Sequence, residues 1–199
     1  MINLEKISEK EPYKVFLDYH NAAKLNGQKN VEAISISSFN FENNQVESRY
    51  VNLKYIIDEE WIFFSNYNSK KASDFSSHDQ ISVLFYWDLL NVQIRIKAHI
   101  KKTDSAFSDL HYSKRNMSKN AIAVSSKQSK QIDSYDEVVS NYQSALNNKD
   151  VLKKRPHYWG GYSFTPFYFE FWEGHEFRLN KRNIFHISDN EWKSFIIQP

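Results

Sequence analysis

The chain has 199 residues, a formal net charge of +2 and no cysteine, and 41% of its residues are hydrophobic. This length and composition predict a single domain over residues 1–199 with a substantial core. The near balance of charge gives no reason to expect a nucleic-acid partner, and the absence of cysteine excludes disulfides and thiolate metal sites. Without a secretory signal or an apolar run long enough for a bilayer, we expect a cytoplasmic protein that does not bind membranes.

The first third of the chain predicts one helix followed by strands. Residues 11–25 carry apolar side chains at helical spacing, and Pro12 suits the first turn. Residues 31–39 and 46–57 are rich in β-branched residues and predict two strands, and residues 61–66 predict a third.

The middle of the chain holds the clearest strand pattern. Residues 69–78 predict a short helix with Ser69 as its N-cap. The run at 81–87 predicts a fully buried strand. Residues 92–101 alternate strictly between apolar and polar side chains, which places one face of a strand in a core and leaves the other polar.

Two helices and a set of strands are expected in the remainder. The helices are predicted at 104–117 and 136–148. The tail predicts strands at about 158–172, 175–180, 183–188 and 191–197. Because the strands follow one another without crossover helices, the sequence favours an antiparallel sheet closed into a barrel with peripheral helices, in a mainly β fold.

The standard catalytic motifs are absent from the sequence. There is no glycine-rich phosphate loop, no paired-histidine metal motif and no nucleophile elbow. The seven histidines are scattered along the chain. Hydrolases and metalloenzymes are therefore disfavoured, and no metal is expected.

Cationic side chains form four clusters along the chain. Taken singly, each cluster is typical of a solvated surface. Interleaved with aromatic residues, the four together favour a site for a phosphorylated planar ligand, because arginine binds phosphate bidentately and aromatic walls suit a ring. The clusters are Arg49 with Lys54, Lys70 with Lys71, Lys114 with Arg115 and Lys119, and Arg178 with Lys181 and Arg182.

Residues 155–182, "RPHYWGGYSFTPFYFEFWEGHEFRLNKR", resemble the C-terminal signature of the pyridoxamine 5'-phosphate oxidase family. Four upstream segments resemble the same family in order and spacing: "SRYVNLK" (48–54), "FFSNYNSKKA" (63–72), "SVLFYWDLLNVQIRI" (82–96) and "SKQS" (126–129). The resemblance extends from about residue 11 to the end of the chain.

The resemblance implies an antiparallel split β-barrel that forms a homodimer with FMN at the subunit interface. By position, it assigns thirteen residues to FMN. These are Arg49, Tyr50, Val51, Asn52, Phe64, Ser65, Lys70, Lys71, Gln93, Gln128, Ser129, Trp172 and Arg182.

The resemblance also implies a substrate and a reaction. Pyridoxamine or pyridoxine 5'-phosphate would be oxidised to pyridoxal 5'-phosphate with O₂ as the acceptor. The substrate phosphate would be held by Lys54, His111, Arg115 and Lys119. Arg178 and Asn180 would lie against the substrate as catalytic residues.

Several positions depart from the family pattern. The family's R-L-H-D-R is "RLNKR" here, so Asn180 replaces a histidine and Lys181 an aspartate. Lys70 replaces an arginine and Phe64 a tyrosine. His111 stands at a tyrosine position and Lys119 at a serine position. The residues for FMN are thus better preserved than those for the substrate. Two alternatives remain: a related FMN oxidase of the phenazine-pathway type, and a non-catalytic protein that binds FMN or pyridoxal phosphate.

Overall fold

The computed structural model describes residues 2–199. Helices and strands alternate irregularly along the chain. In order they are β1 (Asn3–Ile7), α1 (Glu11–Leu25), β2 (Ala33–Asn40), β3 (Gln45–Asn52), β4 (Tyr55–Asp58), β5 (Glu60–Asn66), α2 (Lys70–Ser77), β6 (Gln80–Trp87), the 3₁₀ turn η1 (Asp88–Leu90), β7 (Val92–Lys102), α3 (Ser105–Ser113), α4 (Met117–Ser125), α5 (Tyr135–Asn147), α6 (Lys149–Lys153), β8 (Trp159–Glu173), β9 (Lys181–Ser188) and β10 (Glu191–Ile196).

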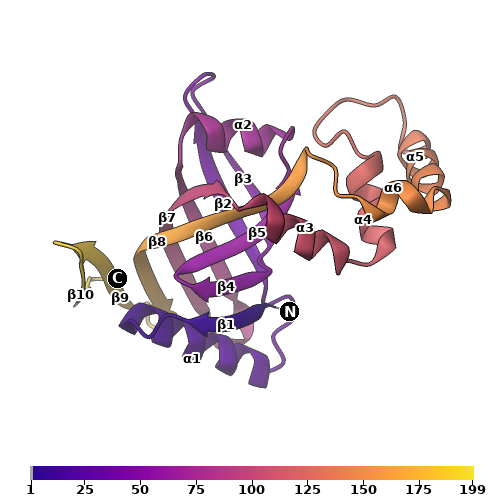
Figure 1. Cartoon of the computed structure of the whole chain (residues 1–199). Coiled ribbons are helices and arrows are strands. Elements are labelled where there is room, and N and C mark those ends of the chain that lie inside the picture. The colour runs from indigo at the N-terminus through magenta and orange to yellow at the C-terminus, as the bar shows by residue number, and fades with distance from the viewer. Residues whose placement is uncertain (1) are drawn as a thin grey trace.

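The ten strands form one sheet in the order β1-β4-β5-β8-β7-β6-β2-β3, with β9 joined to β8 and β10 to β9. The sheet curls around a core, with α1 at one end and α2 at the other, and with α3 to α6 on one side (Figure 1). Every strand pair is antiparallel except β1 with β4, which is parallel. The predicted mainly β split barrel with peripheral helices is therefore confirmed, with one parallel pair added.

Strand β8 divides the sheet. It pairs with β7 from Tyr162 to Glu173, with β5 through its first six residues, and with β9 through its last six. The hairpin of β9 and β10 consequently leaves the barrel on the side away from α4, α5 and α6 (Figure 1).

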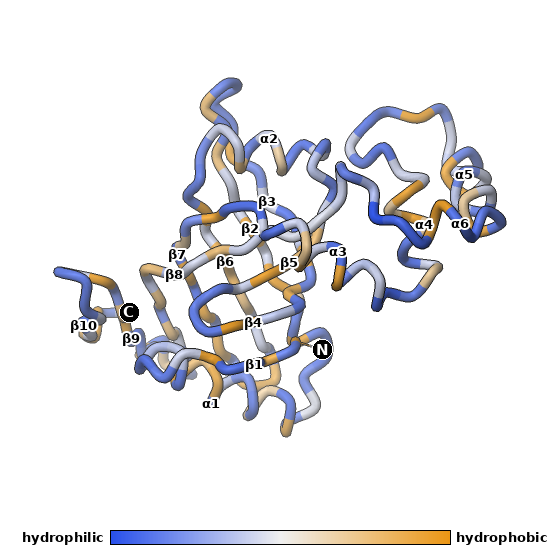
Figure 2. Tube along the Cα trace, viewed as in Figure 1, coloured by the Kyte–Doolittle hydropathy of each residue, from blue (hydrophilic) through white to orange (hydrophobic). Residues whose placement is uncertain are grey.

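Aromatic side chains fill the barrel. Phe16 from α1 lies 4.5 Å from Trp61 of β5 between ring centroids, and Tyr13 lies 5.3 Å from Phe169 of β8. These four side chains are fully buried. Hydrophobic segments recur on the strands, whereas the connecting loops are mostly hydrophilic (Figure 2). Helix α1 therefore closes one end of the barrel, and it has the bounds that the sequence predicts.

The predicted strand at 46–57 is wrong, because the chain breaks between β3 and β4. Leu53 turns into the core, and its N–H donates to Glu32 O at 2.9 Å. Lys54 donates its N–H to Ile62 O at 2.8 Å. Because of this turn, the side chain of Lys54 does not continue the alternation of side chains between the two faces of β3.

The run at 81–87 is a strand but is not fully buried. In β6 the burial alternates, and Tyr86 is 56% exposed. The reason is that β6 lies between β2 and β7, and only one face of this part of the sheet meets the core.

Three other features differ from the predictions or qualify them. Residues 175–180 form turns rather than a strand, with a positive φ of 60° at Arg178. The predicted helix at 104–117 is interrupted between Ser113 and Met117. Helix α5 has no buried residue, because it lies on the outside of the helical side rather than against the barrel.

Two adjacent glycines allow α3 to lie close to β8. A Cβ at Gly160 would overlap the Tyr67 hydroxyl, and one at Gly161 would overlap Thr103. The Gly161 N–H donates to Ser108 Oγ of α3 at 3.0 Å. The glycines therefore bring α3, which carries the predicted site residue His111, against the start of β8.

No helix among residues 2–199 is both long enough and apolar enough to cross a membrane.

Candidate functional site

A cavity of about 540 Å³ opens where the end of β3, the middle of β5 and the α3–α4 connection meet. It contains most of the residues predicted for the phosphate and ribityl side of the cofactor and for the substrate phosphate. Its lining residues are Tyr50, Val51, Asn52, Lys54, Phe64, Ser65, Lys71, His111, Lys114, Arg115, Asn116, Lys119, Gln128 and Trp159.

The cavity is strongly cationic. Its lining includes Lys54, Lys71, Lys114, Arg115 and Lys119, and no aspartate or glutamate. Burial lowers the pKa of Lys54, and the charges of Lys119 and Arg115 lower it further, although Glu32 acts in the opposite direction. A partly buried group of like charges without a carboxylate is suited to an anionic ligand.

Arg115 owes its place in the cavity to the break between α3 and α4. Its Nη1 donates to Asn120 Oδ1 at 3.3 Å, and its Cζ lies 4.3 Å from the centroid of the Trp159 ring. Asn120 is itself buried and donates to Tyr112 O and Leu152 O. The guanidinium is therefore oriented from two sides while part of its fork stays open to the cavity.

Three stacked rings form one wall of the cavity. The rings of Phe64 and His111 lie 3.6 Å apart at 9°, and those of Phe64 and Trp159 lie 5.3 Å apart at 11°. His111 Nδ1 lies 2.8 Å from the Tyr55 hydroxyl. Burial lowers the pKa of His111 to about 4, with further lowering from Arg115 and Lys54, so the imidazole is neutral at pH 7.

The first turn of α2 also borders the cavity. Lys71 is buried there and donates from Nζ to Ser69 Oγ at 3.3 Å. Ser69 occupies the N-cap position, but its hydroxyl donates to Asn66 O instead of capping the helix. The N–H of Lys70 donates to Ser129 Oγ at 3.4 Å, and the Lys70 ammonium pairs with Glu47. A buried lysine at the N-terminus of a helix is a suitable environment for phosphate, because its charge adds to the positive end of the helix dipole.

Arg49 lies behind this part of the cavity and does not line it. Its Nη2 pairs with Asp74 Oδ2 at 3.1 Å and its Nη1 donates to Ser38 Oγ at 2.7 Å. Asp74 is fully buried in α2 and also accepts from Asn40. Arg49 thus fastens β3 to α2 and fixes how the two approach each other.

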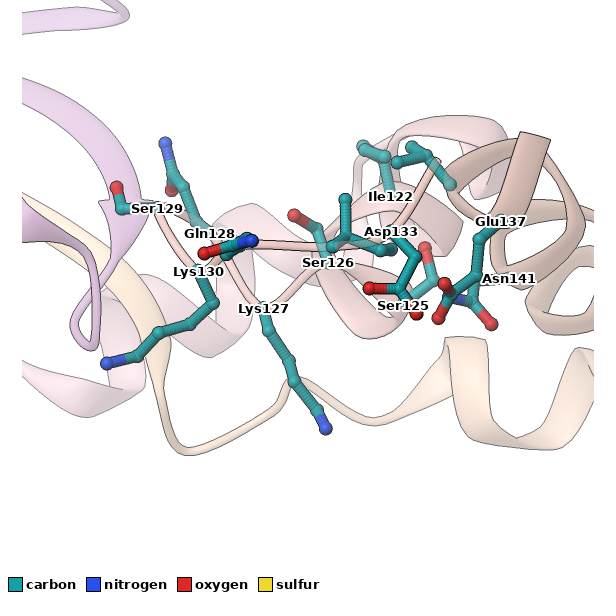
Figure 3. Close-up of a pocket in the computed structure, with 13 residues that line it drawn as sticks. Ile122, Ser125, Ser126, Lys127, Gln128, Ser129, Lys130, Asp133, Glu137 and Asn141 are labelled. Atoms are coloured by element: carbon teal, nitrogen blue, oxygen red, sulfur yellow. The ribbon is translucent and has the colours of Figure 1, made fainter. Parts of the chain in front are cut away.

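Gln128 belongs to the loop between α4 and α5 and lines the cationic cavity and three others beside it. One of these, of about 380 Å³, lies between this loop, the end of α4 and the start of α5. In Figure 3, Gln128 projects to the opposite side from Lys127 and Lys130. Ser129 next to it has a positive φ of 69°. The loop therefore presents Gln128 toward the cationic cavity and leaves the two lysines outside.

A second group of predicted residues forms a row across three strands. Gln93 of β7 is paired with Trp172 of β8, and Trp172 is paired with Arg182 of β9. Tyr86 of β6 is paired with Gln93 and extends the row. None of these residues lines the cationic cavity.

Arg178 and Asn180 lie near this row, in the loop before β9. Arg178 is exposed, and the Asn180 Oδ1 accepts the His175 N–H at 3.0 Å. Within one chain, the loop and the row lie away from the cavity, since β9 and α4 leave opposite sides of the barrel (Figure 1). The structure thus divides most of the predicted site residues into two groups, whereas Arg49, Lys70 and Ser129 neither line the cavity nor belong to the row.

Four residues at these surfaces were not predicted as site residues. Lys114, Asn116 and Trp159 line the cavity, and Tyr86 extends the row. Lys114 belongs to a predicted cationic cluster but was assigned no ligand, and Trp159 lies within the segment that resembles the family signature, so both carried a usable signal in the sequence. The prediction that the strand at 81–87 is fully buried excluded Tyr86 as a surface residue.

The fold and the cavity define a split-barrel protein with a cationic, aromatic-walled site for an anionic ligand. Residues 28–160 match the family model described as pyridoxamine 5'-phosphate oxidase. Residues 159–199 match that of the pyridoxine 5'-phosphate oxidase C-terminal dimerisation region. The chain belongs to the pyridoxamine 5'-phosphate oxidase family.

Individual relatives agree with this family assignment. The chain is 31% identical over 198 residues to a pyridoxine/pyridoxamine 5'-phosphate oxidase of Colwellia psychrerythraea, covering 98% of this chain and 90% of the relative. It is 33% identical to one of Cytophaga hutchinsonii, covering 94% and 88%. Its fold matches PhzG of Burkholderia lata, solved with tetrahydrophenazine-1-carboxylic acid, with a TM-score of 0.89 at 23% identity over 96% and 93% of the two chains.

Proposed function

We propose that the protein is an FMN-dependent oxidase that converts pyridoxamine or pyridoxine 5'-phosphate to pyridoxal 5'-phosphate with O₂ as acceptor. The observation that carries this proposal is the cationic cavity, which combines five lysine and arginine side chains with stacked rings and has no carboxylate in its lining. Such a cavity suits ligands that join phosphate to a planar ring. Two such molecules, cofactor and substrate, take part in the proposed reaction.

The residues on the α2 side of the cavity suit FMN. Lys71, Ser65 and the N-terminal end of α2 would hold its phosphate, since they provide a cation, a hydroxyl and the positive end of a helix dipole. The segment from Tyr50 to Asn52, together with Gln128, would lie along the rest of the cofactor. When bound, FMN supplies the redox chemistry, while the protein binds and orients the reactants.

The residues on the α3–α4 side suit the substrate phosphate. Lys54, Arg115 and Lys119 supply charge, and His111 supplies a neutral ring at the same wall. Burial of Lys54 and Arg115 strengthens their attraction for a phosphate dianion, because charges interact more strongly away from bulk water. This group would hold the substrate by its phosphate and so fix the position of its reactive carbon.

A homodimer would unite the two groups of site residues. The row of Gln93, Trp172 and Arg182, together with Arg178 and Asn180, belongs to the part of the chain that matches the dimerisation region or to the strand paired with it. We propose that this row from one subunit covers the cavity of the other and completes the flavin site. Arg178 and Asn180 would then lie against the substrate.

The experiment is a turnover assay on FMN-loaded protein. Oxygen consumption and pyridoxal 5'-phosphate formation are followed with pyridoxamine 5'-phosphate, pyridoxine 5'-phosphate and unphosphorylated pyridoxine. The proposal expects equal rates of oxygen loss and product formation with a phosphorylated substrate, and little activity without the phosphate. Absence of turnover on both phosphorylated substrates would refute it.

One observation favours a second candidate, an FMN oxidase with a different ring substrate. The side chain of Asn180 is already engaged within its own loop, where it accepts the His175 N–H. It therefore offers the substrate fewer hydrogen-bonding groups than a free side chain would. Oxidation of a partly reduced aromatic acid, such as a tetrahydrophenazine carboxylate, without oxidation of the pyridine phosphates would support this alternative.

A further inference from the structure

Tyr55 and His111 form a side-chain pair at the edge of the cavity. Tyr55 begins β4 and His111 lies in the last turn of α3, and the Tyr55 hydroxyl lies 2.8 Å from His111 Nδ1. Packing fixes both rings. His111 lies flat on Phe64, and Tyr55 meets the ring of Phe107 edge-on at 5.3 Å. The hydrogen bond therefore joins two side chains that have little freedom to turn.

The protonation of the two groups decides the direction of this bond. Burial raises the pKa of Tyr55, with a further contribution from Glu5, so its hydroxyl keeps its proton and can donate. Burial and the surrounding cations lower the pKa of His111, so its ring carries one hydrogen at pH 7. A phenol is a better donor than acceptor, and among residues 2–199 its only hydrogen-bond partner is His111 Nδ1. Nδ1 is then the acceptor, and the ring hydrogen lies on Nε2.

The cavity favours the same tautomer. No residue within 2–199 forms a hydrogen bond with His111 Nε2, and the ring lines the cavity with Lys54, Lys114, Arg115 and Lys119. A phosphate oxygen held by these cations would be attracted by an N–H at Nε2. The opposite tautomer would direct a lone pair at that oxygen and repel it.

We propose that Tyr55 is a positioning residue, which holds His111 in the Nε2–H form so that the ring donates a neutral hydrogen bond to the substrate phosphate. This inference rests on the proposed function for the identity of the phosphate compound. The hydroxyl of Tyr55 does not touch the substrate and acts through His111. The pair gives the phosphate a donor that does not depend on protonation of the imidazole.

The direct test is the ring nitrogen spectrum of His111. Long-range ¹H–¹⁵N correlation spectra of the protein as purified at pH 7 should show that Nε2 of His111 is protonated and Nδ1 is not. The variant His111→Phe assigns the signals. Inorganic phosphate is the probe, and it should shift Nε2 more than Nδ1. A ring protonated at Nδ1 would overturn the proposal.

Tyr55→Phe tests whether the hydroxyl sets the tautomer, since the phenyl ring keeps the packing. We expect a mixture of both tautomers and a dissociation constant for phosphate raised roughly fivefold, the effect of one hydrogen bond. Tyr135→Phe removes a hydroxyl from an exposed site on α5 and is the matched control. An unchanged tautomer and an unchanged phosphate affinity in Tyr55→Phe would overturn the proposal.

Kinetics give a second, separate readout. In Tyr55→Phe, KM for pyridoxamine 5'-phosphate should rise roughly fivefold while kcat stays within about twofold. Combined with His111→Phe, Tyr55→Phe should add nothing. An equal added effect in both backgrounds would contradict action through His111. A protein without any oxidase turnover would refute the proposed function, whereas the nitrogen spectrum and the phosphate titration would still decide the role of Tyr55.

Discussion

The Glu170 carboxylate and the Arg182 guanidinium form an ion pair, with Oε1 and Nη2 2.7 Å apart, that joins β8 to β9. The other oxygen of Glu170 accepts from Arg95 Nη1 of β7 at 2.8 Å. Glu170 is 1% exposed, so its charge is compensated by two arginines at the surface of the sheet. The pair therefore fixes the side chain at one end of the row that includes Gln93 and Trp172.

Glu170→Gln should weaken both the fold and this row. The change leaves two arginines next to a neutral amide, and we expect the free energy of unfolding to fall by about 1.5–3 kcal/mol. Urea unfolding followed by tryptophan fluorescence measures the loss. Glu176→Gln, in the exposed turn before β9, should leave stability unchanged; equal midpoints for the two variants would contradict the structural role of Glu170.

Arg115→Lys should raise KM for the phosphorylated substrate. Lysine keeps the charge but loses the fork and the contact with the Trp159 ring, so we expect an increase of roughly tenfold with kcat largely retained. Arg115→Ala should raise KM further. Lys14→Ala, which removes a charge from the exposed side of α1, is the control, and an equal change in KM there would show that the effect is not local.

Gly160→Ala should destabilise the protein because its Cβ would overlap the Tyr67 hydroxyl. We expect a cost of about 1–3 kcal/mol, typical of overpacking. Tyr67→Leu makes room at this position, so the double variant should lose less stability than the sum of the two single variants. Strict additivity in urea unfolding would show that the contact does not matter.

The stability of the fold should decline as the pH falls below about 6.5, and His20 is one cause. Its ring is buried in the core between Phe16 and Trp87, and burial lowers its pKa, with a further contribution from Lys24. Below pH 6.5, His20 therefore binds a proton in the unfolded chain but not in the folded chain. The contribution of the neutral His20 to the free energy of unfolding is fully present above pH 6.5 and is lost on acidification. The slope from one such group reaches about 1.4 kcal/mol per pH unit.

His20→Leu separates this contribution from that of His111, whose pKa is also lowered. The variant should show a flatter dependence of unfolding free energy on pH between 6.5 and 5. The same slope in the variant and the original protein would exclude His20 as a source of acid sensitivity.

Asn180→His should increase turnover on pyridoxine 5'-phosphate several-fold. An imidazole nitrogen can still accept the His175 N–H, and the ring adds a group that titrates near neutrality. FMN content, measured from the visible absorbance, should not change. An unchanged rate with normal FMN content would count against the placement of Asn180 at the substrate.

Local patterns were sufficient for much of the fold. The alternation in β7 and the helical spacing in α1 depend on neighbours within each element, and both elements lie where expected. The break at Leu53 could not be predicted in the same way. It depends on Leu53 filling the core and on Lys54 bonding to Ile62, a contact with another strand.

The cavity illustrates the same limit. The resemblance assigned Lys54, His111 and Arg115 to one phosphate, and the structure brings these side chains to one cavity. No pattern in the sequence indicates that Tyr55 would bond to His111, because the two residues are 56 positions apart and meet only when α3 packs beside β4 and β5. The separation of Gln93 and Trp172 from the cavity likewise follows from the sheet order rather than from any local segment.

The most direct test of the account is the visible spectrum of the FMN-loaded protein under anaerobic conditions, before and after pyridoxamine 5'-phosphate is added. We predict that the flavin absorbance near its long-wavelength band bleaches on addition and returns when air is admitted. A flavin spectrum that stays unchanged after the substrate is added would contradict the proposed oxidase.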